Sequence, residues 1–171
     1  MITEINTGIP TDTNRRIVNN LFTAGSWRYG KDNTEPNINK NDTGFLMVTY
    51  MLENQGYFLD NVLNAYAYMI LDIVNQKSII KIKQVKRIFW NWYNPSSQCT
   101  FHKDSDDAKN YSIVYSMFDN DGGTEFKIND KNKFYQSFES KALLFPSIIE
   151  HRGKASVKKP NRFNLNIMGE I

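Results

Sequence analysis

Apolar residues recur at helical spacing in two segments of the first half of the chain. One stripe follows capping residues at Thr11–Thr13 and consists of Ile17, Val18, Leu21 and Phe22. The other has steps of three and four and consists of Leu59, Val62, Leu63, Tyr66, Ile70 and Ile73. These stripes predict an amphipathic helix from Thr11 to about Gly25 and a second one that ends near Gln76. We expect both to pack on a core.

After Ser78 the pattern changes from helical spacing to strand-like alternation. β-branched and aromatic residues dominate positions 82–93, which predicts a long strand. Residues 111–118 alternate, and Asp119–Gly123 supplies a turn before a strand at 124–128, which predicts a hairpin. Short strands are expected at 134–138, 141–145 and 162–167. The Asn-rich stretch Lys31–Thr43 predicts a loop.

Helices followed by short strands are typical of an α+β domain. We expect one domain over residues 1–171, since typical domains have about 100–200 residues. Within it, a helical support over about 1–80 would cover a sandwich or small barrel over about 81–171. No internal repeat or Pro/Gly/Ser-rich linker divides the chain.

Composition narrows the range of partners. The chain has 21 basic and 18 acidic residues, and a net charge of +3 is weak support for a nucleic-acid partner. A single cysteine, Cys99, cannot form an internal disulfide, which favours a reducing compartment. There is neither a membrane-length apolar run nor the layout of a signal peptide at the start. We therefore expect a cytoplasmic protein without a membrane partner.

The two histidines of the chain fall where a metal site would need them. On an extended strand, His102 and Asp104 point to the same face. His151 follows a buried-type strand that ends at Pro146. Two histidines and one carboxylate can hold Fe(II) and leave other coordination positions open. Because H-x-D alone is a weak signal, the prediction depends on the other pieces.

Arg162 opens the last alternating strand and shares its polar face with Asn164 and Asn166. An arginine in the mouth of a barrel would bind an anion.

Four pieces in this order resemble one known family. They are Phe101–Asp104, Asp121–Phe126, Ala142–Ser147 followed by His151–Gly153, and Arg162. Together they resemble the 2-oxoglutarate- and Fe(II)-dependent dioxygenases, and most of all the prolyl-4-hydroxylase-like branch with its small phage-encoded members. The resemblance covers about Tyr93 to Ile167.

The resemblance implies a double-stranded β-helix, or jelly roll, with N-terminal helices packed on its outer sheet. It implies that His102, Asp104 and His151 are the catalytic metal ligands. Arg162 would then pair with the far carboxylate of 2-oxoglutarate, and Tyr93 would hydrogen-bond the same carboxylate. Tyr115 and Asn164 are further candidates for the cosubstrate pocket.

The implied enzyme uses Fe(II), O2 and 2-oxoglutarate as cosubstrate, with ascorbate as an optional addition. It would hydroxylate a protein or peptide side chain and release succinate and CO2. A phage-encoded member would act in the host cytoplasm.

The chain departs from the branch at two points. The branch often has lysine in place of Arg162, so Lys158 or Lys159 could compete, although both precede Pro160 and so fall in a connecting loop. A glycine common before the H-x-D is replaced by Asn94–Ser97, which leaves the shape of the substrate entrance open.

Other interpretations stay open beside this one. Cys99 near His102 fits a half-buried cysteine better than a nucleophile, Asp106 and Asp107 fit a solvated turn, and zinc motifs are absent. The densest basic stretch of the chain consists of Lys77, Lys81, Lys83, Lys86 and Arg87. These residues would form either a solvated strand face or a groove that binds the phosphates of a nucleic acid. A groove would favour an oxygenase acting on nucleic acid; a small metabolite or a non-catalytic jelly-roll binding module are further alternatives. The oligomeric state stays open.

Overall fold

The computed structural model describes residues 1–24, 27–29, 45–52, 60–97 and 99–171. Helix α1 spans Thr11–Thr23 and helix α2 spans Asn61–Lys77. Both confirm the helices predicted from apolar spacing, and their ends lie within about two residues of the expected ones. The Asp60 side chain accepts a hydrogen bond from the Leu63 amide at 2.9 Å and so caps α2. Leu59 and the loop predicted at 31–43 lie outside the described residues.

The described strands form two antiparallel sheets. They are β1 (Thr3–Asn6), β2 (Arg28–Tyr29), β3 (Phe45–Met51), β4 (Gln84–Tyr93), β5 (Asn110–Ser116), β6 (Gly123–Ile128), β7 (Lys131–Gln136), β8 (Lys141–Pro146), β9 (His151–Lys154) and β10 (Arg162–Glu170). The large sheet has the order β1-β8-β5-β10-β4-β3-β2, and the small sheet has the order β7-β6-β9.

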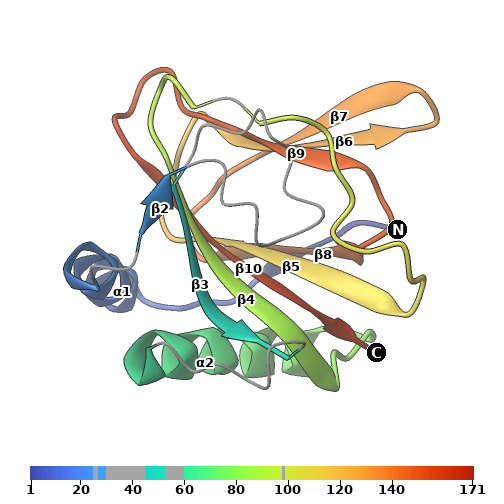
Figure 1. Ribbon diagram of the computed structural model, residues 1–171, viewed down its shortest axis with the longest axis horizontal. Helices are drawn as coiled ribbons and strands as arrows, with labels where there is room; N and C mark the ends of the chain where they lie inside the picture. Colours follow the sequence, from blue (N-terminus) through green and yellow to red (C-terminus); the bar gives the residue numbers. More distant parts are fainter. Residues whose placement is uncertain (25–26, 30–44, 53–59, 98) are drawn as a thin grey trace.

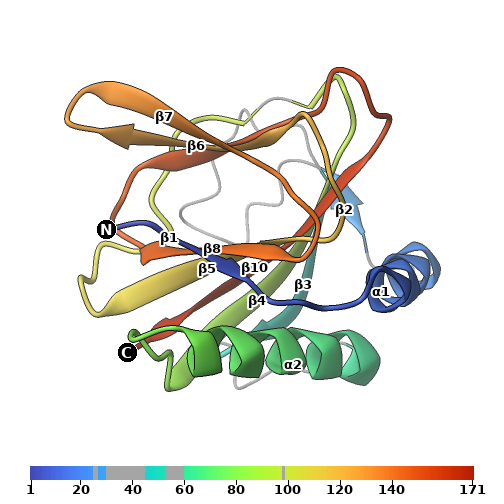
Figure 2. The ribbon, with the colours of Figure 1, turned by 180° about the vertical axis from the view of Figure 1, so that it is seen from behind.

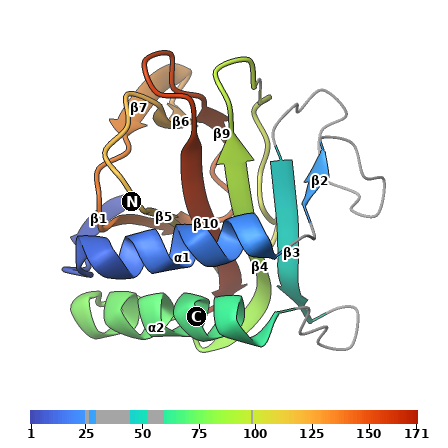
Figure 3. The same ribbon diagram turned by 90° about the vertical axis from the view of Figure 1, so that its left-hand side faces the viewer.

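The elements stack in three layers. The small sheet lies over one face of the large sheet, and both helices lie against the other face (Figures 1 and 2). Figure 3 shows α1 and α2 side by side across β10, β4 and β3. This arrangement confirms the predicted α+β jelly roll with helices on the outer sheet. Within the part of the chain described, no helix has the length and apolar character that a membrane span requires.

Alternation along β10 divides the large sheet into two chemically different faces. Phe163, Leu165 and Ile167 join the apolar core on the helix side. Arg162, Asn164 and Asn166 face the space between the sheets, because neighbouring strand residues point to opposite faces. Among the described residues, the apolar cluster between the sheets is small, and its buried members are Val114, Phe126, Leu143 and Phe145. The inter-sheet space is therefore where buried polar chemistry collects.

The first 80 residues supply strands as well as helices, so the predicted order of helices first and strands afterwards is wrong. β1 pairs with β8, and β3 pairs with β4, both within the large sheet. β1 has a single buried position, Ile5, too little for alternation to show. β3 is a nearly continuous apolar run, which alternation does not reveal.

The predicted hairpin of β5 and β6 is also wrong. β5 pairs with β8 and β10 in the large sheet, whereas β6 pairs with β7 and β9 in the small sheet. The turn signal at Asp119–Gly123 therefore marks a passage from one sheet to the other. The hairpin that forms joins β6 to β7 through Asn129 and Asp130, whose φ angles of 51° and 59° suit a tight two-residue turn.

Tyr115 lies on the helix side of β5, and the prediction that it lines a cosubstrate pocket is wrong. Its side chain is fully buried in the helix-side core. Its hydroxyl donates a hydrogen bond of 2.6 Å to Oδ1 of Asn14 on α1. The Asn14 amide in turn donates to Ser140 Oγ at 3.1 Å. Tyr115 therefore fastens α1 to the large sheet.

We expect Tyr115→Phe to lower the free energy of unfolding by about 1–3 kcal/mol, because it leaves the buried Asn14 oxygen without a donor. Urea denaturation measures this change. Tyr111→Phe is the matched control, since Tyr111 lies on the same face of β5 and its hydroxyl has no hydrogen bond within the described residues. Equal stability of Tyr115→Phe and the wild type would contradict the assigned role.

Candidate metal centre

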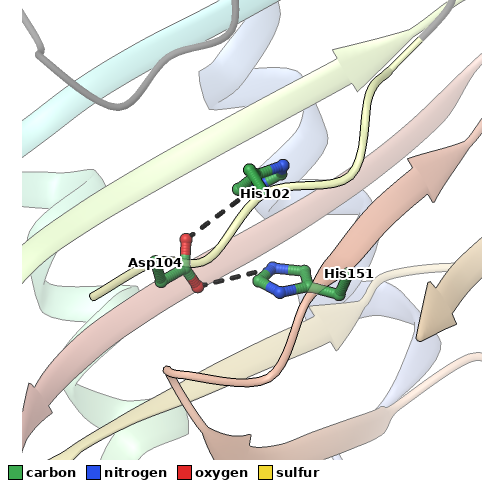
Figure 4. A group of neighbouring side chains, drawn as sticks. All are labelled: His102, Asp104 and His151. Carbon is green, nitrogen blue, oxygen red and sulfur yellow. Dashed lines mark ion pairs between the residues drawn. The ribbon is translucent and has the colours of Figure 1, made fainter. Parts of the chain in front are cut away.

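The fold brings His102, Asp104 and His151 together. One nitrogen or oxygen atom from each lies within 4.8 Å of the others. His151 Nε2 is 3.5 Å from Asp104 Oδ2, and His102 Nε2 is 3.9 Å from Asp104 Oδ1. Figure 4 shows one oxygen of the Asp104 carboxylate turned towards each imidazole. The convergence predicted from the sequence is therefore present in the structure.

His102 reaches this position without the extended strand predicted for the H-x-D segment. It forms one isolated β-bridge with His151, the first residue of β9. The two backbones exchange N–H···O bonds of 2.9 Å in both directions. A paired exchange of this kind brings the residues directly opposite each other. The ring centroids accordingly lie 4.6 Å apart.

A bend after His102 then carries Asp104 towards the large sheet. The Asp104 amide donates to the Ser147 carbonyl at 3.0 Å. The Ser147 hydroxyl lies 2.8 Å from Ser112 Oγ, and Ser112 in turn donates to Asp104 Oδ2 at 2.5 Å. Ser147 therefore fixes both the backbone and, through Ser112, the carboxylate of Asp104.

Backbone carbonyls fix both imidazoles in the form that a metal needs. His102 Nδ1 lies 3.1 Å from the Thr100 carbonyl, and His151 Nδ1 lies 2.9 Å from the Ile149 carbonyl. Because a carbonyl only accepts hydrogen bonds, each Nδ1 carries the proton and each Nε2 presents a lone pair. Burial also lowers the pKa of His151, which favours its neutral form.

Asp104 is buried and ionised. It accepts hydrogen bonds from Arg87 Nη2, from Ser112 Oγ and, at 3.3 Å, from Asn166 Nδ2. Burial alone would raise the pKa of this carboxyl. The Arg87 guanidinium makes the largest opposing contribution, the Ser112 hydrogen bond adds to it, and the pKa of the carboxyl lies well below its usual range.

Two neutral imidazole nitrogens and one carboxylate oxygen are a donor set that suits a first-row divalent cation such as Fe(II). The His102 side chain is 28% exposed and that of His151 only 4%, so the site is more open on the His102 side. Asp106 and Asp107 are exposed and lie outside the group, as predicted for a solvated turn.

Arg162 lies on the same inter-sheet face and is buried, with 2% of its surface exposed. Its Nε donates to Ser137 Oγ at 3.0 Å, and its guanidinium lies over the Tyr93 ring, 5.1 Å from the centroid. With its amide oxygen turned towards Arg162, Asn164 accepts from Nη1 at 3.2 Å and Nη2 at 3.0 Å. Burial lowers the pKa of Arg162.

None of these partners is an anion, and within the described residues no carboxylate lies at ion-pair distance from Arg162. A buried guanidinium with neutral partners keeps an uncompensated positive charge, which is the electrostatic condition that an anion-binding site requires. Lys158 and Lys159 are exposed, and Lys159 Nζ donates to the Asp119 carbonyl at 2.6 Å. Of the three candidate cations, Arg162 is therefore the one that is buried between the sheets.

Tyr93 and Asn164 both lie beside Arg162, where the sequence placed them. The Tyr93 hydroxyl also lies close to Gly153 on β9, because a Cβ at Gly153 would be 2.9 Å from it. The absence of a side chain at Gly153 thus leaves room for Tyr93.

Strand β10 connects Arg162 to the candidate metal ligands. Arg162 and Asn166 are four residues apart on one face, which is about 13 Å along a strand. Asn164 lies between them and faces Asn91 of β4, with 2.8 Å between the two amides. A row of polar side chains on one face of β10 therefore connects the buried guanidinium of Arg162 to the residues that hold Asp104.

Sequence reasoning missed Arg87, which it left in the basic stretch. Counting back from Tyr93 in steps of two along β4 passes Asn91 and Phe89 and reaches Arg87, so alternation could have placed it on the site face. Other members of the stretch have partners elsewhere: Lys77 donates to the Asn6 and Thr7 carbonyls, and Lys86 pairs with Glu170.

Comparison with solved structures identifies the fold. A prolyl hydroxylase from Trichoplax adhaerens, in complex with a hypoxia-inducible-factor peptide fragment, superposes with a TM-score of 0.67 and 15% identity, over 99% of this chain and 83% of that chain. A viral collagen prolyl hydroxylase from Paramecium bursaria Chlorella virus-1, in complex with 2-oxoglutarate, gives 0.62 and 14%, over 99% and 96%. The α-ketoglutarate-dependent epimerase SnoN gives 0.72 and 6%, over 98% and 76%.

The chain therefore has the fold of the 2-oxoglutarate- and Fe(II)-dependent dioxygenases, including their prolyl hydroxylases, as the sequence predicts. No family model and no curated protein sequence matches the chain. At identities this low, the likeness establishes the fold.

We expect Co(II), a stable substitute for Fe(II), to raise the melting temperature of the metal-free protein. Saturation at one hundred times the dissociation constant adds about 2.7 kcal/mol of stability, or about 5–10 °C. His151→Ala should abolish the shift, because it removes a ligand nitrogen. Differential scanning fluorimetry measures both proteins.

Asp106→Ala is the control for this experiment and should keep the full shift, since Asp106 is exposed and pairs with Lys103. A Co(II) shift that persists in His151→Ala would remove His151 from the metal centre.

Proposed function

We propose that this protein is an Fe(II)- and 2-oxoglutarate-dependent dioxygenase that hydroxylates a protein or peptide side chain and releases succinate and CO2. One observation carries the proposal. The two-histidine, one-carboxylate group and a buried guanidinium without an acidic partner among the described residues face the same space between the two sheets. Such a pair suits a metal and an anionic cosubstrate bound together.

Each residue has a defined task in this reaction. His102, Asp104 and His151 would hold Fe(II), and the carbonyls of Thr100 and Ile149 keep both imidazoles in the ligating form. When bound, Fe(II) supplies the oxidising chemistry that couples decarboxylation of 2-oxoglutarate to hydroxylation of a C–H bond.

Arg162 would bind the far carboxylate of 2-oxoglutarate through its planar fork. Ser137 and Asn164 orient that fork, and the Tyr93 ring shields one of its faces from water. Tyr93 is also our candidate for a hydrogen bond to the same carboxylate.

A protein or peptide substrate is supported by the prolyl hydroxylases among the structural neighbours, one of which holds a peptide fragment. A nucleic-acid substrate has less support, because Lys77, Lys86 and Arg87 have partners within the protein. A small metabolite is the remaining enzymatic alternative. The third class is a jelly-roll module that binds ligands without turnover.

We expect the protein to form succinate from 2-oxoglutarate only when Fe(II) is present. His102→Ala should abolish succinate formation, because the metal centre loses one of its three ligands. Chromatography of the organic acids, with and without 2-oxoglutarate, measures turnover. Folded protein that binds metal and makes no succinate under any condition would favour the binding module.

The substrate class is tested by comparing cells that express the active protein with cells that express His102→Ala. We expect peptides that carry one extra oxygen atom in the first cells and not in the second. Mass spectrometry of the proteome, the nucleosides and the metabolites detects the product. Oxidised nucleosides or metabolites without oxidised peptides would contradict the peptide assignment.

Arg162→Ala should weaken 2-oxoglutarate binding by about 2–5 kcal/mol, because truncation of one partner of a desolvated charge pair has this effect. Calorimetry of the metal-loaded protein with 2-oxoglutarate measures it. Lys159→Ala is the control and should bind normally, since Lys159 is exposed. Normal binding by Arg162→Ala would transfer the assignment to Lys158 or Lys159.

A further inference from the structure

Arg87 is a buried cation that reaches the candidate metal centre from the middle of the large sheet. It is 9% exposed and lies on β4 between its cross-strand neighbours Met168 and Met51. Its guanidinium lies over the Phe89 ring, 4.6 Å from the centroid, and forms an ion pair with Asp104 Oδ1.

Sheet register explains how three neighbouring strands hold one carboxylate. Arg87 on β4 lies opposite Met168 on β10, and Met168 lies opposite Ser112 on β5. Arg87 and Ser112 therefore flank the central strand at the same level, about 10 Å apart by strand spacing. Asn166 lies two residues further along β10 and on the same face. Asp104 thus has donors on both sides and along the central strand.

The donors divide unequally between the two carboxylate oxygens. Ser112 and Asn166 both donate to Oδ2. Among the described residues, the donor to the other oxygen, Oδ1, is Arg87. A carboxylate held at one oxygen can still turn about its terminal torsion, which has a broad energy profile. Holding the second oxygen fixes the plane of the group.

We propose that Arg87 is a positioning residue of the metal centre. By holding Oδ1, it keeps the Asp104 carboxylate in the plane that faces both His102 and His151 before a metal binds. This inference rests on one part of the proposed function, namely that the site binds a divalent metal.

The charge of Arg87 works in the opposite direction. A guanidinium beside the ligand carboxylate repels an incoming divalent cation. If repulsion dominated, removing Arg87 would tighten metal binding, whereas loss of positioning weakens it. The sign of the change in metal affinity therefore separates the two effects.

The experiment is a titration of the full-length, metal-free protein with Co(II), followed by its visible absorption. We expect Arg87→Met to weaken Co(II) binding by about 10–100-fold, as removal of groups that orient metal ligands typically does. We also expect an altered absorption spectrum, since the spectrum reports ligand geometry and would not respond to a loss of stability alone.

Two further variants control this measurement. Lys86→Met removes the neighbouring cation of β4, which pairs with Glu170 instead, and should leave Co(II) affinity and spectrum unchanged. Arg87→Lys keeps the charge but loses the planar fork, so its affinity should lie between those of the wild type and Arg87→Met. If Arg87→Met fails to fold by circular dichroism, Arg87→Lys carries the test.

The proposal would be overturned if Arg87→Met bound Co(II) as tightly as the wild type or more tightly. Where Arg87→Met does not fold, wild-type affinity and a wild-type spectrum in Arg87→Lys would overturn it. The outcome is independent of turnover. Wild-type protein that binds Co(II) but forms no succinate would refute the proposed activity and leave the test of Arg87 intact. Wild-type protein that binds no Co(II) would overturn both.

Discussion

The buried Asp104 carboxylate is the group on which the rest of the site depends. An ionised carboxylate out of water is unfavourable by several kcal/mol unless it is paired and hydrogen-bonded. Here the partners come from three adjacent strands, with Arg87 on β4, Ser112 on β5 and Asn166 on β10. Ser147, just after β8, fixes the backbone. The register of the large sheet is therefore also the geometry of the candidate ligand set, and a shift of one residue in any of these strands would turn a donor to the helix side.

The described residues bring more positive than negative charge into the space between the sheets. Arg87 and Arg162 are both buried, and Asp104 is the buried carboxylate that pairs with Arg87. Arg162 has neutral partners in Ser137 and Asn164. A divalent metal would add to this excess, and a dicarboxylate that reaches both the metal and Arg162 would offset it. The electrostatics thus favour binding of metal and dianion together over binding of either alone.

The sequence predicts the helices and the later strands well, because their apolar periods are long and clear. It also predicts the convergence of His102, Asp104 and His151, through the order of separate pieces along the chain. It fails where tertiary pairing decides the outcome. Alternation on β5 shows that Tyr115 shares a face with Tyr111 and Ile113, but not which face the helices cover. Arg87 looks like one more lysine or arginine of a basic run, because its partner Asp104 lies 17 residues away in the sequence, beyond the end of β4.

The same limit explains why the hairpin predicted for β5 and β6 does not form, and the observed course of the chain shows how the site is assembled. A turn-rich segment after a strand predicts reversal, yet the chain uses Asp119–Gly123 to pass from the large sheet to the small one. The chain returns to the large sheet at β8 and crosses to the small sheet a second time between Pro146 and His151, which places His151 on β9, next to β6 and opposite the Asp104 held by the large sheet. The backbone bridge between His102 and His151 then joins the H-x-D segment to the small sheet. The candidate ligands are thus divided between two sheets, so the spacing of the sheets sets the width of the metal centre, and the bridge keeps that spacing fixed where the ligands meet.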